Sequence, residues 1–304
     1  MSNICPLCGS VDVSNKETIR GAEVNFLYAR NFGVPDALTA HTLNYCVCQQ
    51  CRLGFFSPLE TGGAGLYEHL QTFDWYYMEE KEEFQIAMRF VPNTGTVLEV
   101  GSGKAAFATR VGVDRYAGLE FNDKAIVRAK EKGITLIKES IEEHAKSHPQ
   151  QYDIVVSFQV LEHVTSPSDF IKGCLDSLKV GGVLMLAVPS NDGFAGRAVN
   201  NVLDMPPHHV THWSEYTLRF LPRMFGLETI AVEHERIPEY HRQYARKVRL
   251  EASIRDFIGM GFKLLDLSYR ARLIAKIAGV MARFSGRQDD AAKGHTAVAV
   301  YRKV

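Results

Sequence analysis

Hydrophobic and polar positions along most of the chain fall into blocks that predict strands followed by helices. Apolar runs of strand length lie at residues 96–100, 115–119, 134–137, 153–158, 183–188, 227–233 and 295–302. Stretches with helical spacing separate them, at residues 105 onward, 124–132, 167–178 and 215–224. This alternation predicts a mostly parallel sheet with helices on both faces. We therefore expect a Rossmann-like α/β domain.

The segments outside this alternation suggest three further parts. Residues 1–62 carry five of the six cysteines and end in a proline- and glycine-containing junction, so we expect a small separate module there. Residues 63–235 form the α/β domain, which begins with a helical stretch at 64–90. Residues 236–290 form a helical insertion, and residues 291–304 return to the domain as its final strand.

A glycine turn at the end of the first strand is the main functional signal. Glu99 precedes Gly101-Ser102-Gly103, and a helix is expected to follow. Glycines allow a ligand to touch bare backbone, and the spacing also fits a dinucleotide-binding fingerprint. A carboxylate at Glu99 would repel a pyrophosphate and suits a cationic ligand, while Glu120 can accept hydrogen bonds from ribose hydroxyls. The alternatives are a structural turn with two solvated acids, or a nicotinamide or flavin enzyme.

Four segments in this order resemble the motifs of class I S-adenosylmethionine-dependent methyltransferases. They are LEVGSG at 98–103, GLEF at 118–121, FQVLEHV at 158–164 and LKVGGVLMLAVPS at 178–190. The resemblance implies a seven-stranded sheet whose last strand is antiparallel, with S-adenosylmethionine as the cofactor. The residues it implies for cofactor binding are Glu99, Gly101, Ser102, Gly103, Glu120, Phe121, Ser140, Ile141, Phe158 and Gln159.

An aromatic run on the helix before the first strand is a further candidate. In similar methyltransferases this helix closes over the methionine end of the cofactor, which implies that Tyr76 or Tyr77 reaches the pocket. The alternative is that both tyrosines belong to the core.

Histidines are the candidates for the reaction itself. Methyl transfer is an in-line displacement, and a hydroxyl acceptor needs a base, for which histidine is suited. His208 and His209 lie in PPHHVTHW at 206–213, an element similar to the lid of sugar and small-molecule methyltransferases. His163 lies in an LEH element that, in ubiquinone-pathway O-methyltransferases, can bind a divalent metal together with an earlier acid. Gln159 replaces that acid here, which argues against a metal. The alternative for all three histidines is a structural role.

The cysteine spacing predicts a zinc site. Cys5-x-x-Cys8 and Cys48-x-x-Cys51 supply four thiolates, the usual ligands of structural zinc, with a spacer long enough for an inserted hairpin. Cys46 can replace Cys48 as a ligand, and a redox pair is a second alternative. The head is similar to those of bacterial deoxysugar and surface-polysaccharide methyltransferases. We expect bound metal to stabilise this polar module.

The helical insertion has a net positive charge, although the chain as a whole is neutral. Residues 236–290 hold 12 Lys or Arg against 6 Asp or Glu, and their apolar residues recur at helical spacing. This predicts either a cap that packs on the catalytic domain or on a second copy in a homodimer, or a basic amphipathic surface that lies on an anionic membrane.

Overall charge and segment lengths limit the choice of substrate and compartment. Thirty-five basic residues balance 35 acidic ones, which argues against a nucleic-acid substrate. With no signal peptide and no long apolar run, we expect a cytoplasmic protein. We expect methyl transfer to a hydroxyl, or alternatively a carbon, of a sugar or small hydroxylated metabolite. An RNA methyltransferase with a zinc head and a non-catalytic S-adenosylmethionine-binding scaffold are the rival hypotheses.

Overall fold

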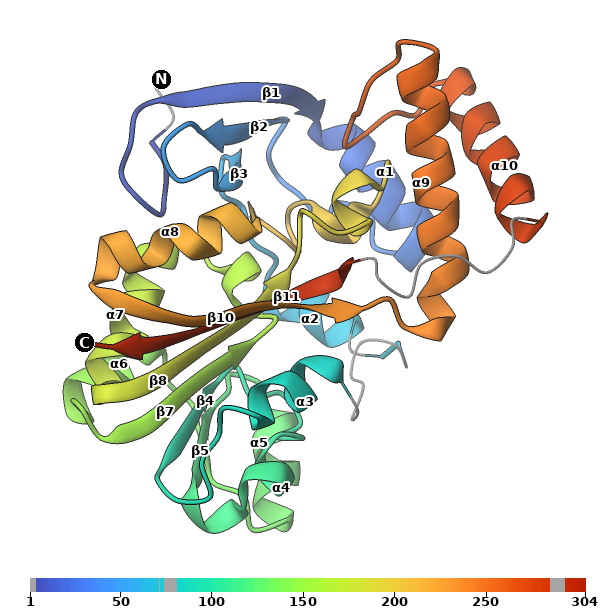
Figure 1. The fold of residues 1–304 in the computed structure, drawn as a ribbon. Helices are drawn as coiled ribbons and strands as arrows, with labels where there is room; N and C mark the ends of the chain where they lie inside the picture. The colour runs from blue at the N-terminus through green and yellow to red at the C-terminus, as the bar shows by residue number, and fades with distance from the viewer. Residues whose placement is uncertain (1–3, 71, 74–80, 285–292) are drawn as a thin grey trace.

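A seven-stranded sheet forms the centre of the computed structural model, which describes residues 4–70, 72–73, 81–284 and 293–304 (Figure 1). Its strand order is β10-β11-β8-β7-β4-β5-β6. The strands are β4 (Val97–Val100), β5 (Tyr116–Leu119), β6 (Leu136–Ile137), β7 (Tyr152–Phe158), β8 (Leu178–Pro189), β10 (Leu227–Arg236) and β11 (Lys293–Lys303). β4 to β8 pair in parallel, whereas β11 runs antiparallel between β8 and β10. The predicted Rossmann-like α/β fold and its antiparallel last strand are confirmed.

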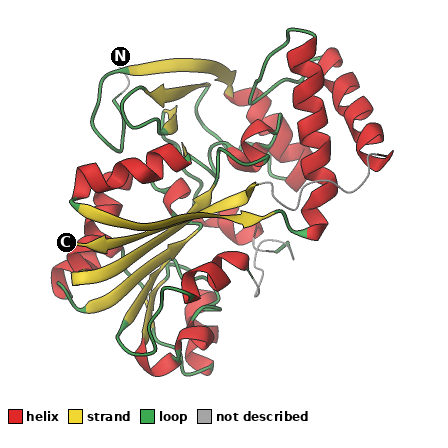
Figure 2. Ribbon diagram, viewed as in Figure 1, coloured by secondary structure: helices red, strands yellow, loops and turns green. Residues whose placement is uncertain are grey.

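Two layers of helices cover this sheet, one on each face (Figure 2). One core contains Leu98 and Val100 together with residues of α6 (Ile141–Ser147), α7 (Pro167–Ser177) and α8 (Glu215–Phe225). The other contains Val97 with residues of α3 (Glu82–Met88), α4 (Ala108–Val111) and α5 (Asp123–Glu131). Successive side chains of a strand point to opposite faces, so β4 is buried on both faces, with Glu99 as the one acid among its apolar residues. This is why the strands appear as continuous apolar runs in the sequence.

The helical stretch predicted before the first strand is divided. Its described parts are α2 (Ala64–Leu70) and α3, and the residues between them include Tyr76 and Tyr77, which lie outside the described residues. The helix predicted from residue 105 also differs, because α4 starts at Ala108. Ala105 has a φ of 53°, so the backbone is still turning at that position.

A second, antiparallel sheet holds the cysteine segment. Its order is β1 (Val13–Arg20), β2 (Thr42–Cys48), β3 (Gly54–Ser57) and β9 (Thr211–His212). β9 belongs to the PPHH element, so the cysteine module and the predicted lid share one sheet. The spacer between the cysteine pairs contains α1 (Gly21–Phe32) as well as strands, a helix that the sequence analysis missed.

The late insertion consists of α9 (Arg242–Phe257) and α10 (Tyr269–Phe284), which pack on each other near α1 (Figure 1). Arg255 forms a buried ion pair with Asp266 at 2.8 Å, and the loop between the helices buries Leu264 and Leu265 against α1. Among the described residues, no helix is both long enough and apolar enough to cross a bilayer.

Candidate active site

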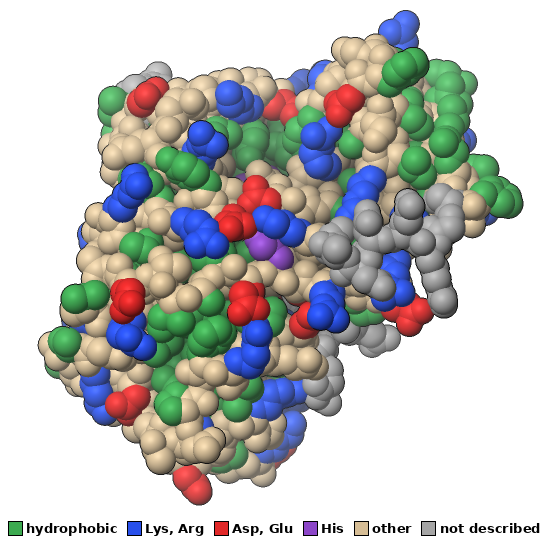
Figure 3. Space-filling model, viewed as in Figure 1, with side chains coloured by type: hydrophobic (Ala, Val, Ile, Leu, Met, Phe, Trp, Pro, Cys, Tyr) green, Lys and Arg blue, Asp and Glu red, His purple; other side chains and the backbone are tan. Residues whose placement is uncertain are grey.

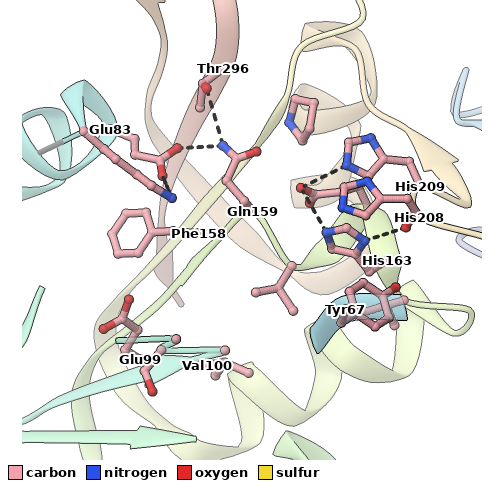
Figure 4. Close-up of a pocket in the computed structure, with 18 of the residues that line it drawn as sticks. Tyr67, Glu83, Glu99, Val100, Phe158, Gln159, His163, His208, His209 and Thr296 are labelled. Atoms are coloured by element: carbon pink, nitrogen blue, oxygen red, sulfur yellow. Dashed lines mark hydrogen bonds and ion pairs between the residues drawn. The ribbon is translucent and has the colours of Figure 1, made fainter. Parts of the chain in front are cut away.

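A cavity of about 1500 Å³ opens at the carboxyl ends of the parallel strands. Open α/β sheets bind their ligands at this edge. The glycine turn after β4 lines one side of the cavity, and the histidines at 163, 208 and 209 line the other (Figure 4). The structure therefore brings residues from most of the predicted motifs to one chamber.

The glycine turn presents bare backbone to this cavity. Gly101 and Gly103 have φ values of 76° and 51°, in the left-handed region where side chains are strained. The amides of Gly101 and Ser102 both donate to the Leu119 carbonyl, at 2.9 and 3.0 Å. A Cβ on Gly101 would lie 2.3 Å from Cγ2 of Val160. Position 101 therefore requires glycine for both conformation and space.

Glu120 lies directly beside that turn. Its Oε2 accepts a hydrogen bond from the Gly103 amide at 2.7 Å, and its Oε1 accepts one from the Asn122 amide at 2.8 Å. These two bonds fix the carboxylate at the end of β5 and leave further lone pairs on both oxygens. Glu120 can thus accept hydroxyl hydrogen bonds from a ligand without a change of rotamer.

Glu99 is almost completely buried in the cavity wall. Its side chain accepts a hydrogen bond from the Tyr116 hydroxyl at 2.5 Å. Burial raises the pKa of Glu99 to about 8, although the Tyr116 hydrogen bond lowers it in part. The carboxyl group is therefore largely protonated at neutral pH until a cation comes near it.

The remaining predicted cofactor residues also line the cavity. Ser140 caps α6, where its Oγ accepts from the Glu143 amide at 3.2 Å. Ile141 is buried behind it, whereas Phe121 is exposed at the rim. Phe158 packs edge-on against Phe84, with ring centroids 4.9 Å apart. These contacts give the floor of the cavity an aromatic and aliphatic surface.

Gln159 joins three elements at the middle of the cavity (Figure 4). Its Nε2 donates to Glu83 on α3 at 2.6 Å and to Thr296 on β11 at 3.4 Å. Glu83 is buried and also lies 3.3 Å from the Lys81 ammonium. The Gln159 amide therefore positions the Glu83 carboxylate. An acid at position 159 could not do this at neutral pH, because its charge and that of Glu83 would repel each other.

A second buried charge pair was missed by the sequence analysis. His295 on β11 pairs with Glu235 on β10, and both line the cavity. Burial favours the neutral imidazole, but the Glu235 carboxylate outweighs it and raises the pKa of His295. These residues lie 60 positions apart and meet only because β10 and β11 pair. No local motif marks them.

The three candidate histidines form one cluster. Ring centroids are 4.6 Å apart for His163 and His208, 4.9 Å for His163 and His209, and 4.5 Å for His208 and His209. Burial lowers the pKa of each, to about 4 for His163, so all three are neutral at pH 7. Tyr67 on α2, which the sequence analysis missed, contacts His163 edge-on at 5.7 Å.

The third histidine of the PPHH element has a structural position. His212 on β9 packs against Tyr45 of the cysteine module, with ring centroids 5.1 Å apart. A Cβ on Gly54 would lie 2.4 Å from the Tyr45 hydroxyl and 3.0 Å from Cβ of His212. Gly54 therefore allows the cysteine module to approach the loop that carries His208 and His209.

The four predicted cysteine ligands also come together. Cys5 Sγ lies 3.5 Å from Cys51 Sγ, Cys8 Sγ lies 3.5 Å from Cys48 Sγ, and all four sulfurs lie within 4.8 Å of one another. A tetrahedral zinc with bonds of about 2.3 Å separates its sulfurs by roughly 3.8 Å. Cys46 is buried but lies outside this group. The donor set fits zinc.

Comparisons with known proteins agree with this geometry. A family model described as a methyltransferase domain matches residues 75–232, just over half of the chain. A ubiquinone biosynthesis O-methyltransferase of Klebsiella pneumoniae subsp. pneumoniae is 36% identical over 109 residues, which cover 33% of this chain and 44% of that protein. A protein of the same name from Salmonella arizonae is 35% identical over 107 residues, 32% of this chain and 43% of that protein. The matches thus span less than half the length of these relatives.

A solved structure supports the fold. A SAM-dependent methyltransferase from Archaeoglobus fulgidus superimposes with a TM-score of 0.53 at 16% identity, covering 78% of this chain and 100% of that chain. Together with the family match, the glycine turn and the seven-stranded sheet, this shows that the chain belongs to the class I S-adenosylmethionine-dependent methyltransferase family.

Proposed function

We propose that this protein transfers the methyl group of S-adenosylmethionine to a hydroxyl of a sugar or a related small hydroxylated molecule. The observation that carries the proposal is the shared cavity, which the glycine turn, Glu99, Glu120 and three histidines all line. Glu99 and the histidines lie on opposite sides of it (Figure 4). The first side suits a nucleoside with a cationic chain, and the second suits an acceptor that must lose a proton.

The charge of the cavity favours a cationic cofactor. Glu83, Glu99, Glu162 and Glu235 all line it and are each at most 6% exposed. Glu83 already pairs with Lys81 and Glu235 with His295, so Glu99 is the acid that remains for the cofactor. A sulfonium with an α-ammonium group would favour its ionised form, whereas a pyrophosphate would not. The same argument disfavours an RNA strand in this cavity.

The acceptor end is assigned to His163, His208 and His209. Neutral imidazoles can remove the hydroxyl proton while the cavity holds the acceptor oxygen in line with the methyl–sulfur bond. Oxygen as the accepted atom is supported by the O-methyltransferase names of the curated relatives. If the acceptor atom were carbon, the three histidines would have to remove a proton from that carbon instead of from a hydroxyl.

A thermal-shift screen tests the substrate class. Nucleotide sugars and free hydroxylated metabolites are added to the protein with S-adenosylhomocysteine, and each stabilising compound is then incubated with methyl-labelled S-adenosylmethionine. We expect label in a sugar-type product. Label in RNA would favour the RNA methyltransferase, and cofactor binding without turnover on any acceptor would favour the scaffold.

We assign a structural zinc ion to Cys5, Cys8, Cys48 and Cys51. These sulfurs all lie within 4.8 Å of one another, and the module they close forms one sheet with β9. The metal would therefore hold the base of the histidine loop as well as the head. The six cysteines carry no disulfide, which suits a reducing cytoplasmic location.

We assign the outward face of α10 to an anionic membrane surface. This helix buries small residues, among them Ala271, Ala278 and Ala282, and exposes larger apolar ones. The exposed apolar stripe is Tyr269, Leu273, Ile277, Val280, Met281 and Phe284, which gather at the edge of the molecule (Figure 3). Arg272, Lys276 and Arg283 border the stripe, and α10 contains no acidic residue. Apolar side chains flanked by cations suit an anionic bilayer; a second copy of the chain is the competing occupant.

A further inference from the structure

Three imidazoles and one carboxylate converge at the acceptor end of the cavity. His163 ends the short 3-10 helix Leu161–His163 after β7, and His208 and His209 come from the loop before β9. One nitrogen from each of the three rings lies within 4.8 Å of the other two. In Figure 4 the three rings lie close together, with those of His208 and His209 stacked on each other.

The hydrogen bonds of the rings fix which nitrogen carries the proton. His163 Nδ1 donates to the His208 carbonyl at 2.5 Å, and His208 Nδ1 donates to the Leu203 carbonyl at 2.8 Å. His209 Nδ1 donates to the Asp204 carboxylate at 3.0 Å. Carbonyl and carboxylate oxygens only accept, so the proton of each neutral ring is on Nδ1 and the lone pair is on Nε2. Histidines that bind metals are oriented by the same kind of outer hydrogen bond.

Glu162 places a buried carboxyl group beside two of these nitrogens. Its Oε1 lies 3.8 Å from His163 Nε2 and 4.0 Å from His209 Nε2. Its Oε2 is buried without a hydrogen-bond partner among the described residues. A buried carboxylate next to neutral rings is costly unless a cation compensates it. A cation beside the three rings would therefore favour the ionised form of Glu162.

We propose that His163, His208 and His209 bind a divalent transition metal of the zinc class through their Nε2 atoms, with Glu162 as the compensating carboxylate. Imidazole suits this class of metal, and three histidines with one open position are a known catalytic zinc set. Metal–nitrogen bonds of about 2.0–2.1 Å would place the nitrogens roughly 3.4 Å apart. The cluster would therefore contract slightly from its present spacing.

The role of this metal rests on the proposed function. A metal held by these histidines would keep one open position, and an acceptor hydroxyl bound there would become more acidic. The hydroxyl proton passes to Glu162, and the oxygen forms a bond to the methyl carbon while the carbon–sulfur bond breaks and sulfur keeps the electron pair. The products are a methyl ether and S-adenosylhomocysteine, and Glu162 returns its proton to solvent. With the metal bound, the histidines would act as ligands, and Glu162 would take over the removal of the hydroxyl proton that the proposed function assigns to the imidazoles.

Metal stoichiometry and cobalt spectroscopy on the full-length chain test the proposal. The protein is stripped with a chelator, loaded with Zn²⁺ or Co²⁺ and dialysed, and its metal content is measured by mass spectrometry. We expect two metals per chain, one at the cysteines and one at the histidines. His163→Gln and His209→Gln should each lose one metal, whereas exposed His41→Ala should keep both. Glu162→Gln keeps the ligands and should weaken the second metal about 10- to 100-fold.

Calorimetric binding of S-adenosylhomocysteine reports whether each variant is folded. One metal per chain in the wild type, bound through the cysteines alone, would overturn the proposal, as would two metals in both histidine variants. If the second metal binds but no acceptor is methylated, the proposed function fails and the metal site stands. If methyl transfer proceeds unchanged without the second metal, the metal proposal fails and the function stands.

Discussion

Binding of the cofactor should release a proton from Glu99. The carboxyl group has a pKa of about 8 because it is buried, so at pH 7 about 0.9 of it is protonated in the unliganded protein. A nearby sulfonium and ammonium favour the carboxylate and return the pKa toward the ordinary value of 4.5. Binding at pH 7 should therefore release roughly 0.9 proton, and affinity should rise up to about tenfold per pH unit between pH 5 and 8.

Isothermal titration calorimetry in two buffers of different ionisation enthalpy measures this release. Glu99→Gln removes the titrating group, so its proton release should be smaller by roughly 0.9 at pH 7, with titration of the ligand's own amine left in both proteins. Its affinity at pH 8 should fall about tenfold or more, since a hydrogen bond to a charged group contributes roughly 1.5–3 kcal/mol. Glu131→Gln, at an exposed position on α5, is the matched control. Equal proton release by wild type and Glu99→Gln would refute the reasoning.

The same shift affects the unliganded protein. Because the folded pKa of Glu99 lies above the unfolded value, ionisation of this carboxyl destabilises the fold progressively from about pH 4.5 to pH 8. Glu99→Gln should therefore raise the melting temperature at pH 8 relative to wild type and change it less at pH 5. A variant that melts lower at pH 8 would contradict the burial argument.

Three other predictions concern the glycine turn, the zinc head and α10. Gly101→Ala must place a Cβ at a φ of 76° and 2.3 Å from Val160 Cγ2, so the turn should be displaced. Calorimetry should then show at least a tenfold loss of affinity for S-adenosylhomocysteine. Unchanged affinity would contradict the claim that the cofactor binds against this turn. Cys48→Ser should lose one zinc per chain and lower the melting temperature, whereas Cys46→Ser should keep its zinc; the reverse result would exchange the ligands. The double substitution Leu273→Glu with Ile277→Glu should abolish pelleting with anionic vesicles, and Val127→Glu is the control. If the wild-type protein does not bind vesicles but forms a dimer in sedimentation equilibrium, α10 contacts a second copy of the chain instead.

The sequence allowed the central sheet and the cofactor half of the cavity to be predicted because both depend on local patterns. Strands buried on two faces appear as continuous apolar runs, and the turn with Gly101 and Gly103 lies within one short segment. The positions of Glu120 and Gln159 follow from the ends of β5 and β7, the parallel strands on either side of β4. These features need no knowledge of distant contacts.

The acceptor half could be predicted only in part. His163 and His209 were identified as candidates, but their convergence with Glu162 depends on how the loop before β9 returns to the sheet. That path is set by pairing of β9 with β3 in the cysteine module, a contact between segments far apart in the chain. Glu235 and His295 were missed for the same reason, since they meet through antiparallel pairing of β10 and β11.

The most direct test of the account is a pair of calorimetric titrations of the purified chain at pH 8, one with S-adenosylhomocysteine and one with NAD. Two carboxylates around a bare-backbone turn should accept the sulfur nucleoside at one site per chain and give no heat with the dinucleotide. Saturable binding of NAD together with no response to S-adenosylhomocysteine would contradict it.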